Sequence, residues 1–309
     1  MPAAAARIAE ADLAVCRRTL AQGSKSFAAA SRLLPGRIRD AVSAMYAFCR
    51  VADDAVDEGD DLDAAVAGLY QRLEAIYAGR PANDPIDRSF AAVVAHHRLP
   101  AALPRALIEG FAWDAAGRRY RTLEELEAYC ARVASTVGLM MTLLMGPRRP
   151  AVLARAGDLG LAMQLTNICR DVGQDARAGR IYLPLDWLQR AGRDPEQLLA
   201  APRHSPALGG VVRRLLAEAD GYYQRADRGI SLLPRDCRLA IRAARLIYAA
   251  IGRRIRRNGC NAVDQRAFTS PAEKLWLIVR AGDALLWPPR THPAPARPAV
   301  QALIDAIEV

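Results

Sequence analysis

The sequence has little material for a β-sheet. Aromatic residues make up 6% of its 309 residues, and stretches in which Val, Ile or Thr alternate with polar residues are nearly absent. Alanine, leucine and arginine, which favour helices, are abundant instead. No linker interrupts the first 287 positions, so we expect an all-α protein with a single domain at residues 1–287 and a proline-rich C-terminal tail at residues 288–309.

The sequence also lacks the motifs of several kinds of site. Its six cysteines form no CxxC pair, and its four histidines have neither HExxH nor ExxH spacing, which argues against zinc hydrolases and di-iron bundles. There is no GxGxxG fingerprint for a dinucleotide, and no helix-turn-helix, zinc-finger or RNA-binding signature. Nothing resembles a secretory signal peptide, so we expect reduced thiols and a cytoplasmic location.

Long apolar runs are missing too, since a membrane-spanning helix takes about 20 such residues. The longest run, residues 133–145, contains serine, threonine and glycine and predicts a buried helix that lines a cavity. Residues 275–287 include Trp276, Leu285, Leu286 and Trp287. We expect them to pack against the core, with peripheral contact at the inner face of a membrane as the alternative.

Basic residues are in excess. The net charge is +10 and the isoelectric point is about 9.7, which indicates an anionic partner: nucleic acid, a membrane surface or a phosphorylated substrate. Because no nucleic-acid motif is present, we expect no nucleic-acid partner. Lys25 and Lys274 are the only lysines in an arginine-dominated chain.

The strongest chemical signal is a polar stripe within residues 161–184. Its members are Gln164, Asn167, Asp171 and Asp175, which are three, four and four residues apart and so share one narrow face of a helix. The rest of this helix is apolar enough to be buried. Two buried carboxylates one turn apart repel each other unless a cation lies between them. Such oxygen ligands suit Mg²⁺, which often shares its coordination shell with substrate phosphates.

A second stripe has similar spacing. Its members are Tyr46, Arg50, Asp53 and Asp57, which are four, three and four residues apart. For one isolated pair of aspartates, a solvated acidic helix face is the better interpretation. Two pairs with polar or cationic neighbours on adjacent turns favour a site for a diphosphate and metal, in which Arg50 clamps phosphate oxygens.

Four longer motifs carry a family resemblance. They are GSKSF at residues 23–27, YAFCRVADDAVDE at 46–58, YCARVASTVG at 129–138 and QLTNICRDVGQDARAGRIYLP at 164–184. Through them the chain resembles the squalene and phytoene synthase family, and most of all its bacterial phytoene synthases. The resemblance extends over roughly residues 10–287.

This resemblance implies the isoprenoid synthase fold, a helical bundle around a central apolar cavity. It implies a prenyltransferase of carotenoid biosynthesis that joins two geranylgeranyl diphosphates head to head, through a cyclopropyl (prephytoene) diphosphate, into 15-cis-phytoene without NADPH. Small residues at positions 28–31 and at Ser43 leave room for this twenty-carbon substrate. Two alternatives stay open: a squalene-type, dehydrosqualene or hydroxysqualene synthase that uses farnesyl diphosphate, and a non-catalytic, membrane-associated assembly protein.

The resemblance also assigns roles to single residues. Two or three Mg²⁺ or Mn²⁺ ions are expected on Asp53, Asp57, Asn167, Asp171 and Asp175. Catalysis is expected from the four aspartates with Tyr129 and Tyr248. Substrate contacts are expected from Ser24, Lys25, Ser26, Tyr46, Arg50, Val133, Val137, Gln164, Asn167, Arg170, Arg266 and Lys274. Residues 176–184 would form a flexible flap, whose Arg177 and Arg180 either reach the diphosphate when it closes or are plain surface cations. Asp114 faces either the cavity or the solvent.

Overall fold

The chain folds as a bundle of helices. The computed structural model describes residues 8–307 except 24–27, 29, 58–61 and 289–293, and the side chain of Asp57 also lies outside this description. The described residues contain no strand, as the sequence predicts. The helices are α1 (Glu10–Gly23), α3 (Gly36–Asp57), α4 (Leu62–Tyr77), α5 (Pro85–His97), α6 (Ala102–Ala115), α7 (Leu123–Cys130), η1 (Ala131–Ser135), α8 (Thr136–Met145), α9 (Pro150–Arg177), α10 (Leu185–Arg190), α11 (Pro195–Ala200), α12 (Pro206–Ile230), α13 (Arg235–Arg257), α14 (Pro271–Arg280), η2 (Ala281–Leu286) and α15 (Pro298–Asp305).

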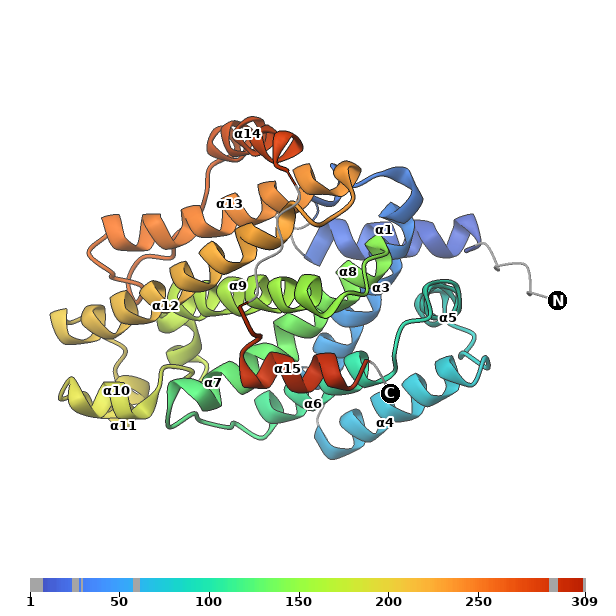
Figure 1. The fold of residues 1–309 in the computed structure, drawn as a ribbon. Coiled ribbons are helices and arrows are strands. Elements are labelled where there is room, and N and C mark those ends of the chain that lie inside the picture. Colours follow the sequence, from blue (N-terminus) through green and yellow to red (C-terminus); the bar gives the residue numbers. More distant parts are fainter. Residues whose placement is uncertain (1–7, 24–27, 29, 58–61, 289–293, 308–309) are drawn as a thin grey trace.

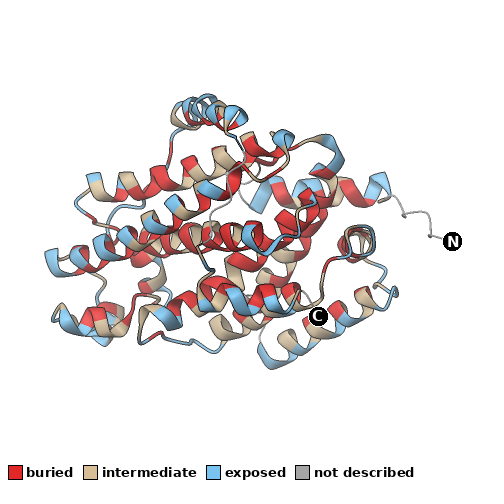
Figure 2. Cartoon of the chain, in the orientation of Figure 1, coloured by how far each residue is buried: buried red, intermediate tan, exposed pale blue. Residues whose placement is uncertain are grey.

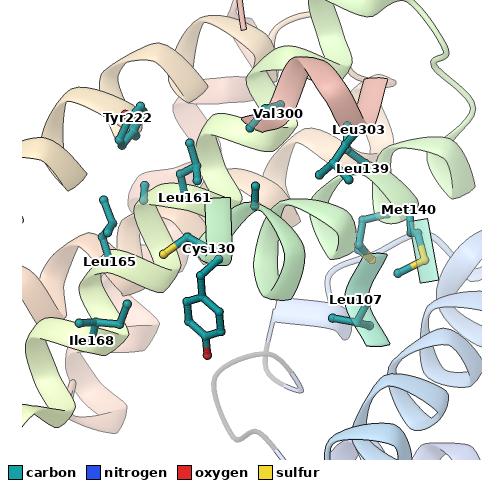
Figure 3. Packing of buried hydrophobic residues seen from close by; sticks show 14 of the residues in the cluster. Leu107, Cys130, Leu139, Met140, Leu161, Leu165, Ile168, Tyr222, Val300 and Leu303 are labelled. Carbon is teal, nitrogen blue, oxygen red and sulfur yellow. The ribbon is translucent and has the colours of Figure 1, made fainter. Parts of the chain in front are cut away.

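The bundle is built around α9. α12 packs along it most extensively, and α8, η1, α13 and α15 also contact it. Figure 1 shows α9 near the middle of the molecule, and Figure 2 shows how much of it is buried. Leu161, Leu165 and Ile168 of α9 are buried in the main hydrophobic cluster, part of which Figure 3 shows. A polar stripe on a helix in this position faces the interior of the protein.

Side-chain caps fix where several helices begin. Asp84 accepts hydrogen bonds from the backbone N–H groups of Ile86 and Asp87 at the start of α5. Thr122 and Ser270 each accept one from the backbone N–H group three residues later, at the starts of α7 and α14. Each cap satisfies a backbone donor that the first turn of a helix leaves without a partner.

The helix expected through residues 133–145 contains a widened turn. Residues Ala131–Ser135 form a π-helix, η1, between α7 and α8. This turn fits tightly against glycines of two neighbours: a Cβ at Gly160 would come within 2.6 Å of the Cα atom of Ser135, and one at Gly110 within 2.6 Å of Val133. The Ser135 hydroxyl also donates to the Gly157 carbonyl oxygen at 2.8 Å. The predicted helix is confirmed, but its wide turn was not predicted.

One stretch is apolar enough to cross a membrane by length and composition. Residues Leu123–Met145 meet both criteria, contrary to our expectation that no run would be long enough. In the structure 67% of the most apolar window is buried, and this stretch packs against α6 and α9. A core helix explains it equally well, and the cytoplasmic location stays a prediction.

The C-terminal segment is attached to the bundle. Val300, Leu303 and Ile304 of α15 are buried, and α15 contacts α7, η1 and α9. The Arg297 guanidinium pairs with the buried carboxylate of Glu127 at 2.8 Å. Arg155, itself buried, donates to the carbonyl oxygens of residues 294 and 295. The domain boundary at residue 288 stays a prediction, and α15 packs into the main core.

Candidate active site

Two adjoining cavities lie at the centre of the bundle. The first, of about 350 Å³, is lined by Tyr46, Cys49, Arg50, Asp53, Leu107, Phe111, Asp114, Tyr129, Val133, Val137, Gln164, Asn167 and Tyr248. The second, of about 220 Å³, has a mainly apolar lining that includes Met141, Met145, Val152, Leu159, Ile230 and Leu233. Val133, Val137, Gln164, Asn167 and Tyr248 border both. A polar chamber therefore adjoins an apolar one, and α3, α6, α9 and α13 all contribute to the first.

Asn167 lies at the junction of the cavities with an unsatisfied amide oxygen. Its Oδ1 atom is buried and accepts no hydrogen bond, while its Nδ2 atom donates to Oε1 of Gln164 at 3.4 Å. A buried acceptor without a partner is costly. This oxygen is therefore suited to a donor or a cation that arrives with a ligand.

The two aspartates of α9 have opposite electrostatic environments. Asp171 accepts hydrogen bonds from Arg170 at 2.9 Å and from Arg266 at 2.7 Å. Burial raises the pKa of Asp171, but these hydrogen bonds outweigh it and hold the pKa below its usual value. Burial and the neighbouring charge of Asp171 raise the pKa of Asp175 to about 7.

This aspartate pair lies beside the polar cavity. Asp171, Asp175 and Arg170 do not line either central cavity, and Asp175 borders a smaller hollow together with Arg180 and Tyr182. The charge of Asp114, which does line the polar cavity, contributes to the raised pKa of Asp175. Asp53 lines the polar cavity while Asp171 and Asp175 do not, so the sharing of one site by both aspartate pairs stays a prediction, as do the roles of these residues.

On α3, an arginine occupies the acidic stripe. The guanidinium of Arg50 donates to Asp53 at 3.2 Å and to Asp54 at 3.0 Å. All three side chains are partly exposed, and Arg50 and Asp53 line the polar cavity. The sequence did not single out Asp54. Of the remaining predicted residues, Ser24, Lys25, Ser26 and the side chain of Asp57 lie outside the described part of the chain.

Asp114 faces the cavity, which settles the choice that the sequence left open. Its carboxylate accepts a hydrogen bond from Tyr129 at 2.6 Å and one from Tyr182 at 2.8 Å. The rings of Tyr129 and Tyr182 stack with centroids 5.3 Å apart, and Tyr120 stacks on Tyr129 at 5.1 Å. Burial raises the pKa of Tyr129 well above its usual value. No sequence pattern brings these groups together, because they come from separate segments.

The surroundings of the site are well packed in this structure. In the segment 176–184, Ile181 and Leu183 are buried, and its role as a flexible flap stays a prediction. Arg177 donates to the carbonyl oxygens of Gly173 and Val263. Ser43 donates to a carbonyl oxygen of its own helix and lines neither cavity, so the room expected beside it is not part of either cavity.

The other predicted cations differ in position. Arg266 is exposed but reaches Asp171, so it belongs to the same cluster of charges. Arg180 lies near Asp175, whose pKa its charge lowers. Lys274 lies on α14 and lines neither central cavity.

The comparisons with known proteins agree with this architecture. A family model described as squalene/phytoene synthase matches residues 20–273. A phytoene synthase from Rhodobacter capsulatus is 53% identical over 97% of this chain and 91% of the relative. A 15-cis-phytoene synthase from Pantoea ananas is 40% identical over 89% and 93%.

Solved structures show the same fold. The crystal structure of a dehydrosqualene synthase in complex with a ligand superposes with a TM-score of 0.83 at 33% identity, over 89% of this chain and 97% of the other. Squalene synthase HpnC from Alicyclobacillus acidocaldarius superposes with a TM-score of 0.76 at 28% identity, over 81% and 95%. The isoprenoid synthase fold that the sequence predicted is therefore confirmed.

Proposed function

This chain belongs to the squalene/phytoene synthase family, and on that premise we propose that it is a phytoene synthase of carotenoid biosynthesis. It joins two geranylgeranyl diphosphates head to head, through a cyclopropyl diphosphate, into 15-cis-phytoene. The observation that carries the proposal is the junction of a polar cavity with an apolar one. A prenyl diphosphate has the same two parts, an anionic head and a hydrocarbon chain.

The donors near the polar cavity fit a divalent metal. Among the described residues no three acidic, histidine or cysteine side chains form a ready-made metal cage. Mg²⁺ typically binds one or two carboxylates and completes its shell with water and substrate phosphates, so no such cage is needed. The orphaned oxygen of Asn167 and the carboxylates of Asp53, Asp171 and Asp175, with Asp57, would hold it. When bound, Mg²⁺ or Mn²⁺, as two or three ions, would neutralise the departing diphosphate.

Arginines supply further positive charge at the same end. Arg50, Arg170 and Arg266 are each paired with an aspartate of the site. These pairs keep the acidic groups from repelling one another before a ligand arrives. We assign the three guanidinium groups to the diphosphate oxygens, which they can bind through two parallel hydrogen bonds.

The walls of the cavities protect the reacting carbon atoms from water. Val133 and Val137 stand at the junction, next to Tyr248. A carbocation at this position meets apolar and aromatic groups rather than solvent. The hydrogen bond from Tyr129 to Asp114 fixes the Tyr129 ring at the polar end. We therefore assign to Tyr129 and Tyr248 a place beside the reacting carbon atoms, where their rings help to hold the substrate in position.

The apolar cavity supports the longer substrate. It follows α9 from Asn167 back to Val152, a stretch of about 22 Å at the helical rise. The named relatives of highest identity are phytoene synthases, whereas the dehydrosqualene synthase structure is 33% identical. We therefore place the hydrocarbon chain of geranylgeranyl diphosphate along this stretch.

A product assay tests the proposal. The purified protein is incubated with Mg²⁺ and either geranylgeranyl or farnesyl diphosphate, and the extracted hydrocarbons are separated by chromatography. We expect phytoene from the longer substrate without NADPH. A thirty-carbon product from farnesyl diphosphate alone would refute the phytoene assignment, and no product from either would favour the non-catalytic alternative.

A further inference from the structure

Exposed apolar side chains are concentrated in one segment. Among the described residues seven large hydrophobic side chains are exposed, and six of them lie between residues 268 and 286. These six form what we call the apolar ridge: Phe268, Leu275, Trp276, Val279, Leu285 and Leu286. Val279 is 72% exposed and Leu286 is 87% exposed. Such clustering on one surface marks an interaction site more often than scattered exposure does.

The ridge exists because α14 has two apolar faces. Leu277 and Ala281 are fully buried against α13, where they join a small cluster with Leu246 and Ile247. Leu275, Trp276 and Val279 lie on the other side of the helix, away from this contact. Figures 1 and 2 show α14 on the outside of the bundle. Our expectation that residues 275–287 pack into the core is right for Leu277 and wrong for the ridge.

Positive charge surrounds the ridge. The Arg280 guanidinium lies 5.4 Å from the centre of the Trp276 ring, and that of Arg266 lies 5.5 Å from the centre of the Phe268 ring. Lys274 lies on α14 itself, and Arg253 of α13 lies close enough to Arg280, Arg257 and Glu273 for their charges to act on it. The acidic groups on these elements are Glu273 and Asp283, and Asp283 pairs with Arg242 at 3.5 Å. The rim of the ridge is therefore basic, in a protein of net charge +10.

We propose that the apolar ridge docks on the surface of an anionic lipid bilayer, with its six side chains in the headgroup–acyl boundary and with Arg257 and Arg280 on the lipid phosphates. Aromatic and aliphatic side chains with a basic border are the composition that suits this interface. A second copy of the chain is the weaker occupant, because a two-fold contact through the ridge would bring like charges together.

Docking there would place the cavities close to the bilayer. Ile241, Ala244 and Tyr248 line the cavities from α13, while Leu246 and Ile247 of the same helix contact α14. One helix thus separates the ridge from the apolar cavity, a distance of about 10 Å between helix axes. The docking itself does not depend on the proposed function. If the protein makes phytoene, docking would let this water-insoluble product pass from the cavity directly into the lipid.

Vesicle co-sedimentation tests the docking surface. Full-length protein is spun with vesicles of phosphatidylcholine alone or of phosphatidylcholine with phosphatidylglycerol. We expect binding to the anionic vesicles that weakens with added salt. The triple variant W276S/V279S/L286S should lose at least about tenfold in partitioning, since it removes three of the six side chains that would enter the lipid.

Two matched variants sharpen the result. L62S changes Leu62, which is 37% exposed and is the one exposed large hydrophobic residue outside the ridge in the described part of the chain, and this variant should bind vesicles like the wild type. R257E/R280E should weaken binding to anionic vesicles only. Circular dichroism and phytoene formation in detergent check that each variant is folded. Wild-type binding by the triple variant would overturn the proposal, and so would a shift in its oligomeric size on gel filtration without any change in vesicle binding.

Discussion

Asn167 shows how a functional residue can be recognised from its unsatisfied chemistry. Its buried Oδ1 atom has no hydrogen-bond donor, although most buried acceptors in folded proteins have one. The chain thus keeps a group that costs free energy of folding. This is expected where a ligand completes the hydrogen bonding or the coordination.

The substitution N167L separates the cost of the Asn167 amide to folding from its contribution to ligand binding. We expect the free energy of unfolding of the metal-free protein to rise by about 1 kcal/mol, since leucine removes an unpaired buried oxygen and keeps the branched shape of the side chain. Phytoene formation should fall at least tenfold. Urea unfolding in EDTA and a product assay measure the two effects. N261L is the control, and we expect it to lower the free energy of unfolding, because Oδ1 of Asn261 accepts two backbone hydrogen bonds that leucine cannot accept. A destabilised N167L protein would contradict this account.

His97, which lines neither central cavity, gives the protein a sensitivity to acid. Burial lowers its pKa from 6.5 to about 4, with smaller contributions from the charges of His96, Arg148 and Arg37. Because the folded state holds the imidazole neutral, the protonation of His97 does not affect the stability of the protein above pH 6.5. Between pH 6.5 and about 4 the unfolded state takes up the proton more readily than the folded state, so the stability of the protein falls progressively over this range.

H97Q should remove this loss. Relative to the wild type, the variant should gain about 1 kcal/mol in free energy of unfolding between pH 7 and pH 4.5. Urea unfolding at several pH values measures the difference. H96Q is the matched control, since it leaves the half-buried imidazole of His97 in place and should keep most of the acid sensitivity. Equal curves for H97Q and the wild type would refute the mechanism.

At the scale of helices, the periodicity of the sequence predicted most of the architecture. It did not predict the local features that result from contacts with other helices. The stripes on α3 and α9 are visible in the sequence because they follow the helical repeat. The wide turn η1 is not, since it results from a close fit to glycines on other helices. Likewise the segment 176–184 has the composition of a loop, and the sequence does not show that its Tyr182 stacks on Tyr129 and Tyr120.

The contact between η1 and α9 can be tested with alanine in place of glycine. In G160A the new Cβ atom would lie 2.6 Å from the Cα atom and 2.7 Å from the nitrogen of Ser135, both rigid backbone atoms. We expect a loss of about 2–3 kcal/mol in free energy of unfolding, as for other overpacked positions. Because Val133 lies on η1, activity should fall too.

The chain offers a matched control in Gly68 of α4. Beyond the nearby backbone of its own helix, no heavy atom of the described residues lies within 4 Å of a Cβ built there, so G68A should stabilise the protein by about 0.5–1 kcal/mol. Chemical unfolding compares the two variants. An unchanged stability of G160A would mean that α9 and η1 can move apart, which the close approach of the two backbones does not allow.

At the scale of the whole molecule, the site depends on bringing α3 and α9 together. The sequence predicts two acidic stripes but cannot show which cations reach them. Arg50 pairs within its own helix, whereas Arg266 comes from a segment 95 residues away from Asp171. Asp114 and Tyr129 likewise meet only through the packing of α6 on the α7–η1–α8 stretch.

If both stripes serve one ligand cluster, their effects on binding must be coupled. Mg²⁺ with an unreactive thiodiphosphate analogue of the substrate should raise the unfolding temperature of the wild-type protein, because ligands that bind only the folded state stabilise it. D53N and D171N should each abolish most of that rise. The double variant D53N/D171N should lose little more, because groups that hold one ligand together are not additive. Losses that simply add would instead show that α3 and α9 bind separate ligands, and the one-cluster arrangement would then be wrong.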